Sequence, residues 1–285
     1  MTTPHVLNQA SKAEQFLRLH QPGKLFVLAN CWNLLTARLF QQEGFLAIGT
    51  SSYAVAMTSG VRDGQKIGRE HLIELARTLA SGIELPVSVD LERGYGDTVQ
   101  EVVESVRLVL LAGGVGINME DSTDNPLAPF YEVGFQCEKI RGIREMANSA
   151  GIHLVINARA DMLLHPVSDP SSALKEAIAR GRAYMDAGAD GIFVPDMGNL
   201  TSEMIARLVQ EIGSPINIIA GVNTPPTVKL NELGVARVSL GPRVLRAGLG
   251  LYRRIAREIL DQGTFRQMHD GAMSFDEANR LLESD

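Results

Sequence analysis

Several residue types and patterns that mark large classes of protein are scarce in this sequence of 285 residues. It has only two cysteines, Cys31 and Cys137, which are too few for a disulfide framework, and their surroundings do not predict an activated thiol. It has no run of five or more basic residues and a net charge of −6, so nucleic acid is not an expected partner. It has neither a signal-peptide pattern nor a membrane-spanning apolar stretch, so we expect no membrane partner and a cytoplasmic location.

What the sequence does contain is a regular alternation of short apolar runs and helical patterns. The apolar runs lie at 26–30, 45–48, 86–89, 117–119, 154–157, 192–194, 216–219 and 238–240. The helical patterns lie at 34–42, 68–81, 99–111, 138–150, 173–185, 203–210, 227–232 and 244–260. Such runs suit parallel strands buried on both faces, so the alternation predicts an α/β protein, a closed (β/α)8 TIM barrel. An open doubly wound sheet is the alternative, which the absence of a Gly-x-Gly-x-x-Gly turn disfavours.

Two helices are predicted outside the barrel, in what we expect to be a single domain of residues 1–285. The barrel spans about 22–260. A capping box at Ser11 and Glu14 predicts the start of an N-terminal helix, and a second box at Ser274 and Glu277 predicts a short helix in a C-terminal tail at 261–285. Glycines precede four of the strands, where they would end the preceding helix in the left-handed conformation; these are Gly44, Gly114, Gly188 and Gly234.

Polar residues gather after the predicted strands, where barrel enzymes carry their active sites. Asp90 and Glu92 follow the third strand and, being two apart, are expected to point to the same side. Glu120 follows the neighbouring fourth strand. Oxygen ligands of this kind suit Mg²⁺, with Mn²⁺ as an alternative, and Arg159 after the fifth strand offers a fork for an anionic group. The plainer alternative is that these carboxylates only form ion pairs on the rim.

The histidines and other candidates for proton transfer are less clearly placed. No two histidines have metal-ligand spacing on one helix. His165 follows the fifth strand closely enough to touch the site. Tyr53, Tyr131 and water are further candidates, and the sequence does not rank them.

Six short motifs resemble the isocitrate lyase/phosphoenolpyruvate mutase superfamily. They are Ile-Gly-Thr-Ser-Ser at 48–52, Ser-Gly-Val-Arg-Asp at 59–63, Val-Asp-Leu-Glu-Arg-Gly-Tyr-Gly at 89–96, Gly-Ile-Asn-Met-Glu-Asp at 116–121, Asn-Ala-Arg at 157–159 and Ala-Gly-Ala-Asp-Gly at 187–191. The resemblance covers roughly residues 22–260. The block at 89–96 with the later Glu-Asp pair is fairly specific.

The resemblance implies a role for each matching residue. Asp90 would ligate Mg²⁺ directly, Glu92 and Glu120 would do so largely through water, and Asp63 would be a further acidic group near the metal. Arg159 would bind the anionic group of a small 2-oxo or 2-hydroxy acid. The substrate would also meet the loop after strand two, whose backbone N–H groups would receive its carboxylate, and one further polar residue; these are Thr50, Ser51, Ser52, Tyr53 and Asn217. The helix at 244–260 would be exchanged between subunits of a dimer or tetramer.

The segment at 122–130 departs from the superfamily, and this limits what reaction is expected. It lacks the Lys-Lys-Cys-Gly motif of isocitrate and methylisocitrate lyases and the lysine of the phosphonate enzymes. The resemblance therefore implies an Mg²⁺-dependent lyase that cleaves or decarboxylates a small acid through a metal-stabilised enolate, with Asp63, Glu120 and Arg159 as catalytic residues. The alternatives are P–C bond chemistry on a phosphonate and metal-dependent binding without turnover.

Overall fold

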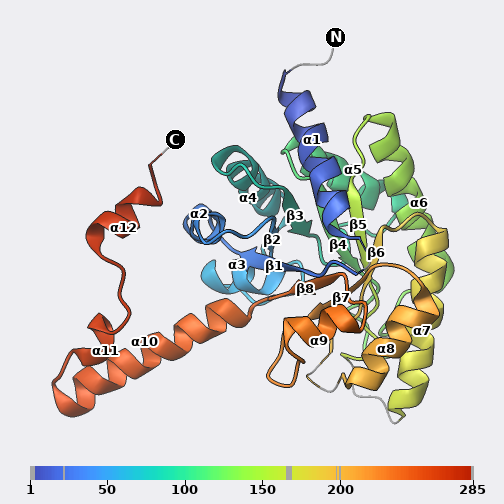
Figure 1. Cartoon of the computed structure of the whole chain (residues 1–285). Coiled ribbons are helices and arrows are strands. Elements are labelled where there is room, and N and C mark those ends of the chain that lie inside the picture. The colour runs from blue at the N-terminus through green and yellow to red at the C-terminus, as the bar shows by residue number, and fades with distance from the viewer. Residues whose placement is uncertain (1–3, 22, 165–168, 197, 199, 284–285) are drawn as a thin grey trace.

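A closed parallel barrel forms the body of the molecule in the computed structural model, which describes residues 4–21, 23–164, 169–196, 198 and 200–283. The strands pair in chain order, and β8 pairs with β1. Their bounds are β1 Phe26–Cys31, β2 Ile48–Thr50, β3 Val87–Asp90, β4 Gly116–Glu120, β5 Val155–Arg159, β6 Gly191–Phe193, β7 Ile216–Ile219 and β8 Arg237–Ser239. The predicted (β/α)8 barrel is confirmed (Figure 1).

Helices surround the barrel and extend beyond it at both ends of the chain (Figure 1). They are α1 Pro4–Leu19, α2 Leu34–Gln42, α3 Ser52–Thr58, α4 Arg69–Gly82, α5 Val99–Leu111, α6 Val133–Ser149, α7 Pro170–Asp186, α8 Ser202–Ile212, α9 Thr227–Glu232, α10 Arg243–Gln262, α11 Arg266–His269 and α12 Phe275–Arg280. The sequence did not predict α3 or α11. Both are short, so neither shows enough turns to reveal a helical period.

The structure corrects three local predictions: the start of the N-terminal helix, the range of the second strand and the position of one left-handed glycine. The N-terminal helix begins at Pro4 and runs through Ser11, because proline is well suited to the first turn and nothing at Ser11 interrupts the helix. The second strand runs from Ile48 to Thr50 and not over 45–48: its pairing with β1 begins at Ile48, opposite Ala29, and it ends where Ser51 caps α3. The left-handed glycine before β4 is Gly113, with φ +96°, and not Gly114.

Other local predictions are confirmed in detail. The predicted capping box at the start of α12 is present: Ser274 Oγ accepts from the Glu277 N–H at 3.2 Å, and Glu277 Oε2 accepts from the Ser274 N–H at 2.7 Å. Gly44, Gly188 and Gly234 have φ of +86°, +109° and +86°, as expected of glycines that end helices.

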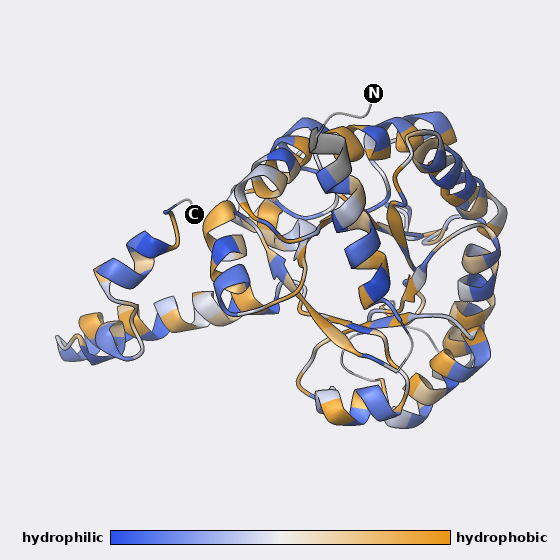
Figure 2. Ribbon diagram, turned by 45° about the horizontal axis from the view of Figure 1, so that its top comes forward, coloured by the Kyte–Doolittle hydropathy of each residue, from blue (hydrophilic) through white to orange (hydrophobic). Residues whose placement is uncertain are grey.

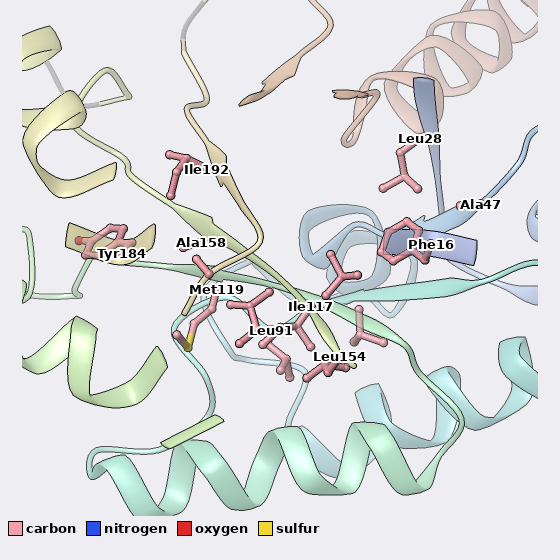
Figure 3. Packing of buried hydrophobic residues seen from close by; sticks show 14 of the residues in the cluster. Phe16, Leu28, Ala47, Leu91, Ile117, Met119, Leu154, Ala158, Tyr184 and Ile192 are labelled. Carbon is pink, nitrogen blue, oxygen red and sulfur yellow. The ribbon is translucent and has the colours of Figure 1, made fainter. Parts of the chain in front are cut away.

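Buried apolar side chains from the strands and the helices pack in one continuous cluster (Figure 3). The barrel interior also carries a buried polar network. Asn157 Nδ2 and Arg237 Nη2 both donate to Asn118 Oδ1, at 2.8 and 3.3 Å. Arg237 Nε donates to Ser239 Oγ at 3.1 Å, and Asn217 Nδ2 donates to the same oxygen at 3.0 Å. This network ties four strands together directly beneath the mouth at the C-terminal strand ends.

Helix α10 leaves the barrel and carries α11 away from it (Figures 1 and 2). The end of α12 returns to α2, where Arg38 Nη1 donates to the carbonyl oxygen of Leu281 at 3.2 Å. Within the single chain the buried side chains of α10 are Leu245 and Glu258, while Leu249, Tyr252 and Leu260 are exposed. Within one chain these three apolar side chains of the helix are therefore left uncovered. Among the described residues no helix is long and apolar enough to span a membrane.

Candidate active site

A cavity of about 310 Å³ opens at the C-terminal ends of the strands, where the sequence predicted the site. Its wall is formed by Asn30, Ser51, Ser52, Tyr53, Asp63, Asp90, Asn118, Arg159, Leu164, Phe193, Pro195, Asp196, Ile219, Ser239, Gly241, Pro242 and Arg243. Six predicted residues thus line one cavity. Four others, Thr50, Glu92, Glu120 and Asn217, are buried outside its wall.

The loop after β2 fixes the carboxylate at the end of β3. Ser52 N–H donates to Asp90 Oδ2 at 3.0 Å, and the Asp90 N–H donates to Thr50 Oγ1 at 2.8 Å. Asp63 stands beside this carboxylate: burial and then the charge of Asp90 raise its pKa, while a hydrogen bond with the Ser52 side chain opposes the rise. Two acidic groups therefore share one wall of the cavity and repel each other.

The backbone donors predicted to receive a substrate carboxylate are already used within the protein. Ser52 N–H is bonded to Asp90, and Ser51 N–H donates to the Cys31 carbonyl oxygen at 3.3 Å. Ser51 Oγ accepts from the Ala54 N–H at 3.4 Å and so caps α3. The loop thus positions Asp90, which is a different use of the same motif from the one that the resemblance implied.

Glu92 approaches Asp90 and Asp63 from a turn and not from a strand, which strand alternation did not predict. β3 ends at Asp90, and Glu92 lies in the following turn with φ +49°. Its carboxylate accepts from the Gln65 N–H at 2.6 Å and from the Tyr95 hydroxyl at 3.0 Å. Burial, followed by the charges of Asp90 and Asp63, raises the pKa of Glu92 to about 7.

The turn that holds Glu92 is conformationally strained. Gln65 and Tyr95, which bond its carboxylate, also have positive φ, of +62° and +53°. In the parts of the chain that the structure describes, Gln65, Glu92 and Tyr95 are the only non-glycine residues with a positive φ. Clustered strain of this kind is typical of functional sites.

Arg159 is held between two carboxylates. Its Nη1 lies 2.8 Å from Glu120 Oε2, and its Nε and Nη2 donate to the two oxygens of Asp161 at 2.6 and 3.0 Å. Burial raises the pKa of Glu120, and the ion pair with Arg159 opposes that rise. The arginine has N–H groups left for an anion, but its charge is already balanced.

Residues behind this ion pair were missed by the sequence analysis. Asp121 is fully buried; it accepts from the Asp161 N–H at 3.0 Å, from the Tyr184 hydroxyl at 2.6 Å and from Arg180 Nη1 at 3.2 Å. Arg180 Nη1 also donates to the carbonyl oxygen of Tyr131 at 2.9 Å. The signal for Asp121 was present in the Glu-Asp pair at 120–121, but nothing local marked the residues on α7.

Tyr131 is engaged by a buried lysine and lies outside the cavity wall. Lys139 Nζ is 4.0 Å from the centroid of its ring, and this nitrogen is buried without a hydrogen-bond partner. Burial lowers the pKa of Lys139 to about 8. Of the predicted proton-transfer residues, Tyr53 lines the cavity, and His165 lies outside the described residues.

The donor set fits a cation that keeps much of its water. Across the described parts of the chain, no three His, Cys, Asp or Glu side chains lie close enough together to hold a metal by themselves. Asp90, Glu92 and Glu120 are therefore not gathered as three direct ligands. Asp63 and Asp90 do face the cavity together, and Mg²⁺ is commonly held by one or two carboxylates plus waters and substrate oxygens.

Comparison with known proteins shows the family to which the chain belongs. Residues 16–260 match the family described as phosphoenolpyruvate phosphomutase. An uncharacterized protein of Mycobacterium tuberculosis is 36% identical over 247 residues, which cover 86% of this chain and 89% of that protein.

Two solved structures share the fold over nearly the whole chain. One, from Burkholderia cenocepacia and provisionally assigned as a lyase or mutase, has 35% identity and a TM-score of 0.89, covering 97% of each chain. The other is phosphonopyruvate hydrolase with oxalate and Mg²⁺, at 25% identity and a TM-score of 0.79, covering 96% of this chain and 94% of that one. The chain therefore belongs to the phosphoenolpyruvate phosphomutase family, in the enzyme superfamily that also contains the isocitrate lyases.

Proposed function

We propose that this protein is an Mg²⁺-dependent lyase that cleaves or decarboxylates a small 2-oxo or 2-hydroxy dicarboxylic acid. The observation that carries the proposal is the pair Asp63 and Asp90, which line the cavity together with Arg159. Bound there, Mg²⁺ (or Mn²⁺) would supply a Lewis acid that polarises the 2-oxo group and favours the enolate. The solved relative that binds oxalate and Mg²⁺ supports this choice of cation and ligand class.

The protein's own groups would orient the substrate. Asp90 is aimed by the Ser52 N–H and Thr50, which leaves its second oxygen for the cation. Glu92 and Glu120 would act from behind the cavity wall through water. Arg159, with its plane fixed by Glu120 and Asp161, would offer its remaining N–H groups to the substrate's carboxylate. Tyr53 would meet the substrate from the start of α3.

The segment at 122–130 argues against isocitrate as a substrate. It forms a tight loop in which Thr123 N–H donates to the Pro129 carbonyl oxygen at 2.8 Å and Thr123 Oγ1 donates to that of Ala128 at 2.6 Å. No cysteine lies in it. The chain's cysteines are both buried, and burial raises the pKa of Cys31 to about 12, so neither is a substitute proton donor at the cavity.

The test is release of pyruvate or CO₂ from oxaloacetate, corrected for its spontaneous decay, with isocitrate and phosphonopyruvate in parallel. We expect turnover of oxaloacetate with Mg²⁺, inhibition by oxalate, and loss of activity in excess EDTA. Efficient turnover of isocitrate, or full activity in EDTA, would refute the proposal.

Phosphonate chemistry is the second candidate, because the similar solved structure with oxalate and Mg²⁺ is a phosphonopyruvate hydrolase. Its signature in the same assay would be metal-dependent release of phosphate from phosphonopyruvate without turnover of oxaloacetate. Binding of oxalate with no turnover of any of these acids would instead indicate a metal-dependent binding protein.

A further inference from the structure

A second arginine, Arg243, lines the cavity on the side away from the acidic pair. It is the first residue of α10 and follows β8, whereas Asp90 and Arg159 stand at the ends of β3 and β5. In the closed barrel, three steps around the ring separate β8 from either of these strands, so Arg243 approaches across the mouth.

The fold holds Arg243 in this place. Asn30 Oδ1 accepts from the N–H groups of Leu240 and Gly241, at 2.9 and 2.8 Å, and so fixes the turn from β8 into α10. The guanidinium packs against Gly221 in the loop after β7: a Cβ built on that glycine would lie 3.3 Å from Arg243 Nη2. A side chain is thus seated between two loops and pointed at the cavity.

Arg243 lacks the compensation that Arg159 has. Its Nε is buried without a hydrogen-bond partner, and among the described residues Arg243 has no ion pair like the two that hold Arg159. Asp196 shares the cavity wall, but its Oδ2 accepts from the N–H groups of Gly198 and Leu200. A half-buried guanidinium with a buried, unused donor favours an anionic ligand.

Resting on the proposed function, we propose that Arg243 binds the second anionic group of the substrate and so selects dianions over monocarboxylates. The head of the substrate would lie at Asp90 and Arg159, and its distal carboxylate or phosphonate would reach Arg243. The cavity, at about 310 Å³, is at the small end of ligand pockets, which suits an acid only a few carbons long.

The test compares three 2-hydroxy acids that share one head group: lactate, malate and 2-hydroxy-3-phosphonopropanoate. Affinities are measured by calorimetry on the full chain with Mg²⁺ present, and oxalate is titrated as a probe of the head-group site alone. Wild type should bind malate or the phosphonate at least tenfold more tightly than lactate, because a charge-assisted fork is gained. Whichever of the two binds better identifies the distal group as carboxylate or phosphonate.

Arg243→Met should lower the affinity for malate and for the phosphonate by about ten- to a hundredfold, while the affinities for lactate and oxalate stay unchanged. Arg243→Lys, which keeps the charge but not the fork, should retain part of the affinity for malate and the phosphonate and guards against a folding defect in the first variant. Arg246→Met, on the exposed side of the same helix, is the matched control and should bind as wild type does.

The outcomes separate this inference from the proposed function. Failure of wild type to bind oxalate in an Mg²⁺-dependent way would refute the metal site and, with it, the present inference. Normal oxalate binding with equal affinities for lactate, malate and the phosphonate would overturn only the role of Arg243. Equal losses for all ligands in both Arg243 variants would overturn it as well.

Discussion

At the scale of single residues, the site is defined by which charges are balanced and which are not. Arg159 is compensated by Glu120 and Asp161, whereas Asp63 and Asp90 stand together, and the charge of Asp90 raises the pKa of Asp63. Like charges held this close favour a bound cation or a proton. Under the proposed function, the acidic pair and the partnered arginine would have different tasks: the first would hold metal, and the second would hold the substrate's anion.

Asp90→Ala is expected to abolish Mg²⁺-dependent oxalate binding without unfolding the protein. The substitution removes the carboxylate that faces the cavity, and it also relieves the repulsion from Asp63. Calorimetry with Mg²⁺ and oxalate measures the first effect, and a thermal melt without metal measures the second. Asp97→Ala, an exposed acidic residue on the same loop, is the control; unchanged Mg²⁺ and oxalate binding in Asp90→Ala would show that the metal site is misplaced.

Lys139→Met is expected to stabilise the protein near neutral pH. Burial holds the folded-state pKa near 8, below the ordinary value of 10.5, so the unfolded chain binds more protons between these values and stability rises with pH there. Below pH 8 the lysine is charged in both the folded and the unfolded state, so the full cost of burying its charge lowers the stability. Removing the Lys139 ammonium should raise the free energy of unfolding by about 1–2 kcal/mol at pH 7, after the loss of its contact with the Tyr131 ring is subtracted.

Urea unfolding of wild type and Lys139→Met at pH 7 and pH 9.5 measures the difference in their free energies of unfolding. The difference between the two proteins should shrink at the higher pH. Lys175→Met, an exposed lysine on α7, should show no such dependence. A Lys139→Met protein less stable than wild type at pH 7 would mean that the ammonium is favourably placed after all.

At the scale of elements, α1 acts as the closure of the barrel's N-terminal end. The Phe16 ring packs on the first residue of β4: a Cβ built on Gly116 would lie 2.5 Å from Phe16 Cε1. The ring also meets His20 edge-on, with centroids 4.7 Å apart, and His20 Nδ1 lies 2.8 Å from the Phe16 carbonyl oxygen. Glycine at 116 therefore makes room for a helix that lies a hundred residues earlier in the chain.

Phe16→Ala is expected to destabilise the protein by about 3–5 kcal/mol, since it empties a fully buried aromatic site. Leu111→Ala, an apolar side chain that is 67% exposed at the end of α5, should change stability by less than about 0.5 kcal/mol. Chemical denaturation of the two variants gives the comparison. Similar losses in both would show that α1 does not close the barrel.

At the scale of the whole molecule, the exposed face of α10 points to a homo-oligomer, a dimer or tetramer. Leu249, Tyr252 and Leu260 are 44, 64 and 83% exposed, and the segment beyond them exposes Phe265 and Phe275 as well. Large exposed apolar side chains that gather on one projecting arm mark an interaction surface. The proposed partner is a second copy of the chain, covering this arm as the resemblance implied.

Light scattering of the wild type at micromolar concentration should give the mass of a dimer or tetramer. The double substitution Tyr252→Asp with Leu260→Asp should lower the mass to that of one chain, because it places charge in the covered face. Leu127→Asp, at an apolar residue that is 93% exposed in the 122–130 loop, should leave assembly unchanged. A wild-type monomer would rule out the oligomer.

The sequence by itself determined the barrel, the family and the edge on which the site lies. These follow from local signals: apolar runs alternate with helical patterns, and carboxylates follow the strand ends at 90 and 120. Asp90, Asp63 and Arg159 could be named because they lie in short motifs. Within the candidate site, the inference that failed locally was the alternation of Asp90 and Glu92, since the strand ends before Glu92 and the turn redirects it.

Only the tertiary structure decided which groups meet. Ser52 donates to a carboxylate 38 residues away, and Asn30 fixes a turn 211 residues later in the chain. No periodicity or spacing encodes such contacts, because they depend on how the ring of strands closes. That closure brings Arg243 to the cavity opposite Asp90 and buries Lys139 under Tyr131. Partnering and burial set the charge state of each group, so the chemistry of the site was decided by the fold as a whole.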